Sequence, residues 1–211
     1  MEETWLEEFR KLAVTRGPCR TAIDIGANAG EWTAWMAVYF DRVLALEPDP
    51  RAFAFLSDRG LPSNVVSSQM AVSGEPGPVT LHMRESPLQS SLLLEHPVGV
   101  AGQPDPPIVQ SVEVPAFTLD ELLAMDEHID FVKVDIEGAE ADVLNAAKDP
   151  RWRDTRWLIE VHDTSKAVGS FLERVGFENL RLMRHPHTDA HPGHFWIYVD
   201  KELTDGSENA G

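Results

Sequence analysis

The spacing of the hydrophobic residues changes between residues 22 and 40. Ile23 and Ile25 lie in a short apolar run, and their β-branched side chains favour a β-strand. Beyond two glycines, Gly26 and Gly30, the large apolar residues recur at helical spacing. These residues are Trp32, Trp35, Met36, Tyr39 and Phe40. The pattern predicts a strand, a tight loop and a helix, and in an open parallel sheet ligands bind at such a loop because backbone amides converge there.

Hydrophobic runs elsewhere predict the remaining elements. The expected strands cover residues 42–47, 65–72, 79–83, 109–114, 131–136, 157–162, 180–183 and 195–199, the last two as a hairpin. The expected helices lie near residues 2–12, 50–59, 119–125, 140–149 and 168–175. Asp49 and the Thr118-x-x-Glu121 capping box mark two helix starts. Proline and glycine interrupt residues 85–107, which we expect to form an irregular loop or a lid.

Length and composition indicate one domain. The chain has 211 residues, of which 43% are hydrophobic, enough for one full core. We expect a single domain over residues 1–200, with a leading helix within residues 1–20 and a disordered tail over residues 201–211. Strands and helices alternate along it, which is typical of an α/β fold.

The charge of the chain limits its partners. A formal net charge of −17 at pH 7 opposes binding to nucleic acid or an anionic membrane, because such binding depends on Lys and Arg that neutralise phosphates. We therefore expect a small neutral or cationic substrate, and the sequence leaves the oligomeric state open. Cys19 is the single cysteine, and no signal or membrane-spanning segment is recognisable, so we expect a reducing, cytoplasmic location.

The first glycine loop differs from two common phosphate-binding loops. A P-loop has Lys and Ser or Thr directly after its second glycine, whereas Gly30 is followed by Glu31. The dinucleotide fingerprint has a glycine two positions after its first glycine, where this chain has Asn28. Phosphate transfer and a nicotinamide cofactor are therefore disfavoured, and a nicotinamide dehydrogenase is a distant alternative that cofactor preference would test.

Two acidic residues favour S-adenosylmethionine (SAM) instead. Asp24 lies just before the loop, where a carboxylate suits a ligand that carries an ammonium and a sulfonium group. Glu47 ends the next predicted strand, at about the 20-residue offset at which α/β nucleotide sites place a ribose-binding carboxylate. Ser91, in the predicted loop, offers a hydroxyl that could reach a bound ligand.

A second polar cluster is predicted at the carboxyl ends of two later strands. Lys133, Asp135 and Glu137 share one face by period two if the chain is extended there. Glu160 and His162 share a face in the same way, and we expect both sets to point toward one cleft. A protein that only binds SAM, as a sensor or scaffold, has no need of this cluster, so the cluster favours an enzyme.

These residues suggest two ways to activate a substrate hydroxyl. His162 is the preferred general base because imidazole titrates near neutral pH, while Glu160 or Glu137 could orient it or act instead, and Lys133 completes the predicted catalytic set. In the second version a divalent ion lies between Asp135 and Glu160 and lowers the pKa of the substrate hydroxyl. Two oxygen ligands would favour Mg²⁺. Four more histidines occupy one loop, where we expect substrate contact rather than a metal. They are His185, His187, His191 and His194.

Several motifs resemble the FkbM family of SAM-dependent methyltransferases. They are IDIGANAGEWT (23–33), ALEPDP (45–50), MAVSG (70–74), SSLL (90–93), TLDELL (118–123) and VKVDIEGAEADVL (132–144). The last motif is the most specific, because a glycine turn with acids on both sides is not needed merely to start a helix. The chain departs from the family at Asn145-Ala146-Ala147, and no motif is matched from Asp163 onward.

The resemblance implies a Rossmann-like class I methyltransferase fold: a seven-stranded, mostly parallel sheet with an antiparallel last strand and helices on both faces. It also implies O-methylation of a hydroxyl on a sugar, a polyketide or another secondary metabolite. The implied cofactor-binding residues are Asp24, Gly26, Ala27, Asn28 and Gly30 on the methionine side, Glu47 and Pro48 at the ribose, Met70 and Ala71 beside the adenine, and Asp135 beside the methyl group.

Overall fold

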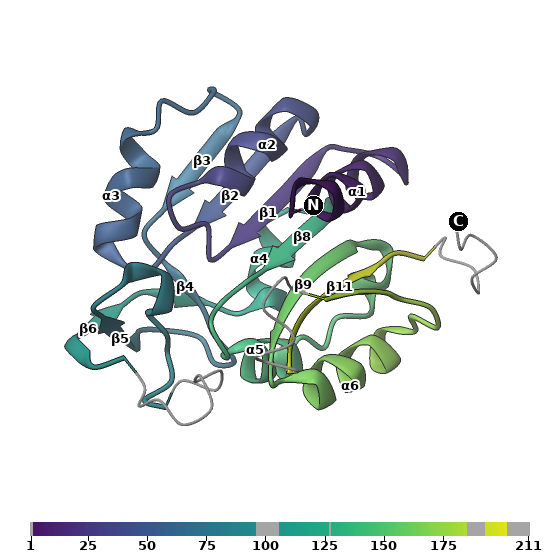
Figure 1. Ribbon diagram of the computed structural model, residues 1–211. Helices are drawn as coiled ribbons and strands as arrows, with labels where there is room; N and C mark the ends of the chain where they lie inside the picture. The colour runs from purple at the N-terminus through teal and green to yellow at the C-terminus, as the bar shows by residue number, and fades with distance from the viewer. Residues whose placement is uncertain (1, 96–105, 127, 185–192, 202–211) are drawn as a thin grey trace.

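The computed structural model describes residues 2–95, 106–126, 128–184 and 193–201, and its central element is a seven-stranded sheet (Figure 1). The strands are β1 Thr21–Ile25, β2 Arg42–Leu46, β3 Val65–Ser68, β8 Ile129–Val134, β9 Arg156–His162, β10 Arg181–Arg184 and β11 His194–Val199. Their order is β10-β11-β9-β8-β1-β2-β3. Neighbouring strands are parallel except β11, which is antiparallel to β9 and β10. The predicted α/β sheet with its closing hairpin is confirmed.

Helices cover both faces of the sheet, as predicted (Figure 1). They are α1 Glu2–Thr15, α2 Glu31–Tyr39, α3 Pro50–Asp58, α4 Leu119–Met125, α5 Glu140–Ala146 and α6 Ser165–Val175. The helices α1, α2 and α3 pack on one face, and α4, α5 and α6 pack on the other. No helix in the described ranges is long and apolar enough to cross a membrane.

The central strands are hydrophobic on both faces because helices bury both. On β8, Phe131 packs toward α1 and α2, whereas Val132 packs toward α4, α5 and α6. Leu158 and Ile159 alternate in the same way on β9, and all four side chains are fully buried. Burial of each such side chain contributes about 1.5–3 kcal/mol, so a slip in register would be costly. The carboxyl ends of β1, β8 and β9 are thereby aligned at one edge.

Two small sheets lie beside this edge. Strand β4 (Ala71–Val72) pairs in parallel with β7 (Ala116–Phe117), and β5 (Val79–Arg84) pairs antiparallel with β6 (Ile108–Val114) (Figure 1). The prediction of one strand over 65–72 was wrong. The chain leaves the main sheet after Ser68, turns through a bond from the Met70 amide to the Ser68 carbonyl, and continues in β4.

The predicted helix caps are confirmed. The Asp49 side chain accepts a hydrogen bond from the amide of Arg51, and Thr118 and Glu121 form a reciprocal capping box. Helix α5 is shorter than predicted, because Asp149 instead caps a separate 3₁₀ turn, η2 (Pro150–Asp154). Within the predicted loop, η1 (Pro87–Gln89) is regular, residues 96–105 lie outside the described ranges, and so does the predicted tail from residue 202.

Gly26 and Gly60 offer a matched test of how closely β1 and β8 approach. Both have positive φ, +75° and +70°, but a Cβ at Gly26 would lie 1.8 Å from the carbonyl oxygen of Asp135, whereas a Cβ at Gly60 meets nothing within 4 Å. Gly60→Ala should lower the free energy of unfolding by about 1–2 kcal/mol through the left-handed backbone alone. Gly26→Ala should cost about 1–3 kcal/mol more, because the strands must separate. Urea unfolding measures both, and equal losses would contradict the close approach.

Candidate functional site

A cleft opens at the carboxyl ends of β1, β2 and β8. The predicted cofactor residues that line it are Gly26, Asn28, Glu47, Pro48, Met70, Ala71, Ser91 and Asp135. Glu137, predicted as catalytic, lines the same cleft. The structure therefore brings residues from five separate motifs of the sequence to one cavity.

Glu47 lines this cleft and is held by two backbone amides, one of them in the glycine loop. Its Oε2 accepts the amide of Asn28 at 2.8 Å, and its Oε1 accepts the amide of Asp49 at 2.8 Å. Asn28 has a φ of 49°, which asparagine tolerates better than most residues, and its side chain accepts the Ala29 amide. Burial raises the pKa of Glu47 to about 7, although the two amide bonds oppose the shift.

Three predicted cofactor residues lie beneath or beside the cleft rather than on its wall. Asp24 is fully buried and accepts the Thr33 hydroxyl at 2.6 Å. Gly30 precedes α2 with a φ of 82°, and a Cβ there would lie 2.5 Å from the Leu56 side chain. Ala27 packs in the small core cluster next to α3. Their contribution to a ligand is therefore the shape of the loop.

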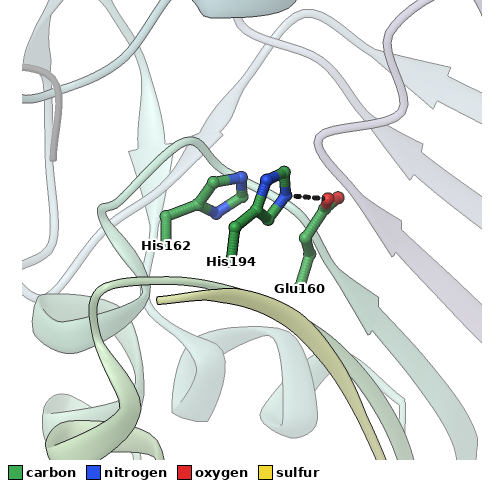
Figure 2. A group of neighbouring side chains, drawn as sticks. All are labelled: Glu160, His162 and His194. Atoms are coloured by element: carbon green, nitrogen blue, oxygen red, sulfur yellow. Dashed lines mark hydrogen bonds and ion pairs between the residues drawn. The ribbon is translucent and has the colours of Figure 1, made fainter. Parts of the chain in front are cut away.

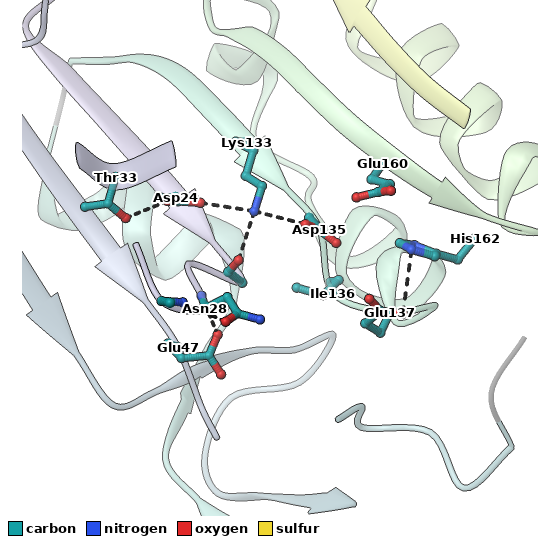
Figure 3. Close-up of polar contacts among 12 residues, drawn as sticks. Asp24, Asn28, Thr33, Glu47, Lys133, Asp135, Ile136, Glu137, Glu160 and His162 are labelled. Atoms are coloured by element: carbon teal, nitrogen blue, oxygen red, sulfur yellow. Dashed lines mark hydrogen bonds and ion pairs between the residues drawn. The ribbon is translucent and has the colours of Figure 1, made fainter. Parts of the chain in front are cut away.

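Lys133 connects Asp24 and the glycine loop with Asp135, which follows β8 (Figure 3). Its ammonium lies 3.3 Å from Asp24, 3.2 Å from Asp135 and 2.9 Å from the carbonyl oxygen of Gly26. Burial alone would lower the pKa of Lys133, but the charges of Asp135, Asp24 and Glu160 outweigh it and raise that pKa above its ordinary value. Lys133 is thus a fixed cation. Of the four predicted catalytic residues, Glu137 lines the cleft, whereas Lys133, Glu160 and His162 do not.

The segment from Ser86 to Leu93 closes one side of the cleft. The Ser91 hydroxyl donates to the carbonyl oxygen of Glu137 at 2.8 Å, and the Ser90 hydroxyl donates to Asp49 at 2.7 Å. Arg51 donates to Asp49, Ser90 and the carbonyl oxygen of Arg84. Sequence reasoning missed this anchoring of the predicted lid, because no local pattern links residues 40 positions apart.

Asp135 also belongs to a cluster of acidic side chains that surrounds the imidazole of His162 (Figure 3). The carboxyl groups of Asp135 and Glu160 are near enough for the charge of Asp135 to raise the pKa of Glu160, and His162 Nε2 lies 3.7 Å from Glu137 Oε2. The prediction that Asp135, Glu137, Glu160 and His162 lie close together is confirmed. The extended backbone from which Glu137 was predicted to reach the others is wrong. Strand β8 ends at Val134, and Glu137 reaches the cluster from a turn in which its φ is 53°.

Two further residues, Glu140 and His194, belong to this cluster although the sequence predicted other roles for them. Glu140, expected only to begin a helix, is fully buried, and its Oε1 lies 3.0 Å from His162 Nδ1. His194, expected in a loop, lies on β11 with its Nε2 2.5 Å from Glu160 Oε1. Only the long-range pairing of β9 with β11 brings His194 here. The other three loop histidines, at 185, 187 and 191, lie outside the described residues.

The carboxylates control the charge of this cluster. Burial and the charge of Asp135 raise the pKa of Glu160 to about 10. Burial works against the charged form of His162, but the hydrogen bond that its Nδ1 donates to Glu140 and the charges of Glu140, Glu137 and Asp135 raise its pKa to about 10. An imidazolium has hydrogen on both nitrogens and no lone pair for a further proton, so in this state His162 is not the free general base that the sequence suggested.

The strand order and the cleft define a class I SAM-dependent methyltransferase fold. Solved structures with this fold include an rRNA methylase from Streptococcus thermophilus, 12% identical, with a TM-score of 0.53 and coverage of 92% of this chain and 95% of that one. A Streptococcus mutans protein described as a methyltransferase, in complex with SAH, is 12% identical, with a TM-score of 0.50 and coverage of 94% and 96%. A precorrin 8W decarboxylase from Methanobacterium thermoautotrophicum is 16% identical, with a TM-score of 0.50 and coverage of 92% and 89%.

The family follows from the sequence itself. The model of the methyltransferase FkbM domain matches residues 24–184, which is most of the chain. The chain therefore belongs to the FkbM family of SAM-dependent methyltransferases, as its motifs indicated. No curated protein matches it.

Lys133 provides a test of the site's architecture. Lys133→Met should lower the free energy of unfolding by about 3–5 kcal/mol, because Asp24 and Asp135 would lose their buried cation. Lys201→Met removes an exposed ion pair with Asp154 and should change it by no more than about 0.5 kcal/mol. Adding Asp24→Asn to Lys133→Met should restore part of the loss. Denaturant unfolding measures all three, and a small effect of Lys133→Met would show that the contact does not hold the site together.

Proposed function

We propose that this chain transfers the methyl group of SAM to a hydroxyl group of a small molecule. The observation that carries the proposal is the continuity of the cleft. Glu47 and the glycine loop lie along one part of it, and Asp135 and Glu137 lie along another. A cofactor held at the first part would direct its reactive group toward the second.

The residues of the first part fit SAM. Each oxygen of the Glu47 carboxylate accepts one backbone amide and keeps a second lone pair, so both can accept a ribose hydroxyl. Met70 and Ala71 supply apolar surface for an adenine, and Asp135, held ionised by Lys133, faces the place where a sulfonium would lie. SAM supplies an electrophilic methyl group.

Proton transfer is the second requirement of O-methylation. The acceptor oxygen forms its bond to the methyl carbon as the carbon–sulfur bond breaks, and the hydroxyl proton must leave. Glu137 lines the cleft and also contacts His162, so we assign proton acceptance to Glu137 and positioning to His162, Glu160 and Lys133. Alignment of acceptor and methyl can supply about 7–11 kcal/mol, and a positioned base adds about 10²- to 10⁴-fold in rate.

The acceptor class is part of the same proposal. Asp135 and Glu137 make the acceptor end of the cleft acidic, which favours a neutral or cationic acceptor such as a sugar, a polyketide or another secondary metabolite. The net charge of −17 opposes a nucleic acid or an anionic membrane as partner. The single cysteine agrees with a cytoplasmic location.

Calorimetric titration with SAM and SAH tests the cofactor site. We expect micromolar binding of both, weaker binding of NAD, and at least tenfold weaker SAM binding in Glu47→Ala. Because the pKa of Glu47 is raised to about 7, its negative charge is lost as the pH falls from 8 to 6, and SAM should bind about tenfold more weakly at pH 6.

Glu47→Gln is the control for this pH dependence. It keeps the shape of the side chain but cannot titrate, so the part of the pH dependence due to Glu47 should disappear. Glu113→Gln, an exposed change on β6 away from the cleft, should leave affinity and pH dependence unchanged. Tighter binding of NAD, or binding of neither sulfur compound, would refute the cofactor assignment.

Glu137→Gln tests the catalytic assignment. SAH formation from SAM is measured with a panel of hydroxylated sugars and polyketide alcohols. The variant should form SAH about 10²-fold more slowly than the wild type, with unchanged SAM affinity, because it lacks the proton acceptor but keeps the cleft. An unchanged rate would exclude Glu137 as the base. SAM binding without SAH formation from any acceptor would favour a binding module.

A further inference from the structure

Three side chains of types that can bind a metal ion lie together on β9 and β11, next to the acceptor end of the cleft (Figure 2). Glu160 and His162 are two residues apart on β9, and His194 pairs directly with His162 across the two strands. The imidazole rings of His162 and His194 have centroids 4.8 Å apart, and His194 Nε2 lies 2.5 Å from Glu160. One ligand atom of each residue lies within 4.8 Å of those of the other two.

The spacing is close to what one ion requires. In a tetrahedral site, ligand atoms about 2.1 Å from a Zn²⁺ ion lie about 3.4 Å from each other. Side-chain movements of about 1–1.5 Å, which close the widest pair and open the 2.5 Å contact between His194 and Glu160, would therefore bring the three atoms into one coordination sphere. His194 is the least buried of the three, with 15% of its side chain exposed, and lies at the first residue of its strand, so it has room for this adjustment.

The hydrogen bond behind His162 is of the kind that orients a metal ligand. Glu140 is fully buried, and its oxygens accept the amide of Gly138 and the hydroxyl of Thr164. An ionised carboxylate can only accept, so the 3.0 Å contact with His162 requires the hydrogen on Nδ1. Carboxylates fix metal-binding histidines in this way and leave the other nitrogen for the ion.

The other nitrogen of His162 faces negative charge. Its Nε2 lies 3.7 Å from Glu137, and Asp135, Glu137 and His162 form a second group of possible ligands that shares this histidine with the first. A lone pair and a carboxylate repel each other unless a cation, either a proton or a metal ion, lies between them. Lys133 cannot supply that charge, because its ammonium is held by Asp24, Asp135 and the carbonyl oxygen of Gly26.

We propose that Glu160, His162 and His194 bind a divalent transition-metal ion of the Zn²⁺ class at the acceptor end of the cleft. Two imidazoles and one carboxylate are a ligand set of catalytic zinc, which leaves a further position open, whereas Mg²⁺ prefers oxygen ligands alone. The site shares Glu160 with the Mg²⁺ site expected from Asp135 and Glu160, but it differs in the ion and in its two imidazole ligands. The role of the ion, unlike its binding, rests on the function proposed above: it would lower the pKa of the acceptor hydroxyl.

Metal binding is tested on the full chain after removal of metals with a chelator. Zn²⁺ is titrated against a chromophoric competitor, and Co²⁺ binding is followed by its visible absorption, which reports a low-symmetry nitrogen and oxygen site. We expect one equivalent of Zn²⁺ to bind, and His194→Ala and Glu160→Gln each to weaken the binding at least about 100-fold. His128→Ala removes an exposed histidine outside the cluster and should bind as the wild type does.

Glu140→Gln separates orientation from ligation. This residue does not belong to the proposed ligand set, yet its change should weaken Zn²⁺ binding about 10- to 100-fold, because His162 loses the partner that fixes its tautomer. Circular dichroism checks the fold of each variant, and His194→Gln replaces His194→Ala if the latter does not fold. Absence of a stoichiometric site, or wild-type affinity in folded His194 variants, would overturn the proposal.

The two proposals can fail separately. Zn²⁺ binding that depends on His194, in a protein that does not bind SAM, would leave the metal site standing and refute the methyltransferase mechanism. SAM binding and SAH formation at full rate in metal-free protein, with no Zn²⁺ site, would refute the metal proposal and leave methyl transfer standing.

Discussion

The buried ammonium of Lys133 is the contact on which the site depends. A charge removed from water is tolerated only where opposite charges and hydrogen-bond acceptors surround it, and here these come from β1, from the glycine loop and from the end of β8. The cation therefore holds the loop that shapes the cofactor end against Asp135 at the acceptor end. Gly26 makes this contact sterically possible. Because it has no Cβ, the glycine loop can lie directly against the backbone of Asp135.

Backbone strain is concentrated at the same edge of the sheet. Within the described ranges, the non-glycine residues with positive φ are Asn28, Glu137 and Asp163, and each lies in the loop that follows a central strand: β1, β8 and β9. A left-handed backbone costs a non-glycine residue about 1–3 kcal/mol and persists only where the surrounding structure fixes it. Here the fixing contacts are visible: Asn28 donates to Glu47, the carbonyl of Glu137 accepts from Ser91, and the Asp163 amide donates to Gly193. The unfavourable backbone conformations thus occur in the loops that position the polar groups of the site.

The sequence predicts the cofactor end of the site much better than the acceptor end. Glu47 and Asn28 belong to a strand–loop–helix unit and its neighbour, where hydrophobic period and glycine position specify the backbone locally. Glu140 and His194 have no such signal, since one resembles an ordinary acid at a helix start and the other a loop histidine, and only tertiary pairing brings them to His162. The one mistaken strand, over 65–72, has the same origin, because the partner of β4 is β7, some 45 residues away.

The two ends of the cleft also rest on independent evidence. The family match covers residues 24–184, so it includes the glycine loop, Glu47 and Asp135 but stops before His194. What the FkbM family shares therefore accounts for SAM chemistry and for the cleft that would hold it, and it gives no reason for an imidazole opposite His162. That imidazole lies 2.5 Å from Glu160, in a cluster whose carboxylates outnumber its cations even with Lys133 in place. A sulfonium beside Asp135 would offset part of this negative charge, and a second cation held by Glu160, His162 and His194 is the simplest way to balance the rest.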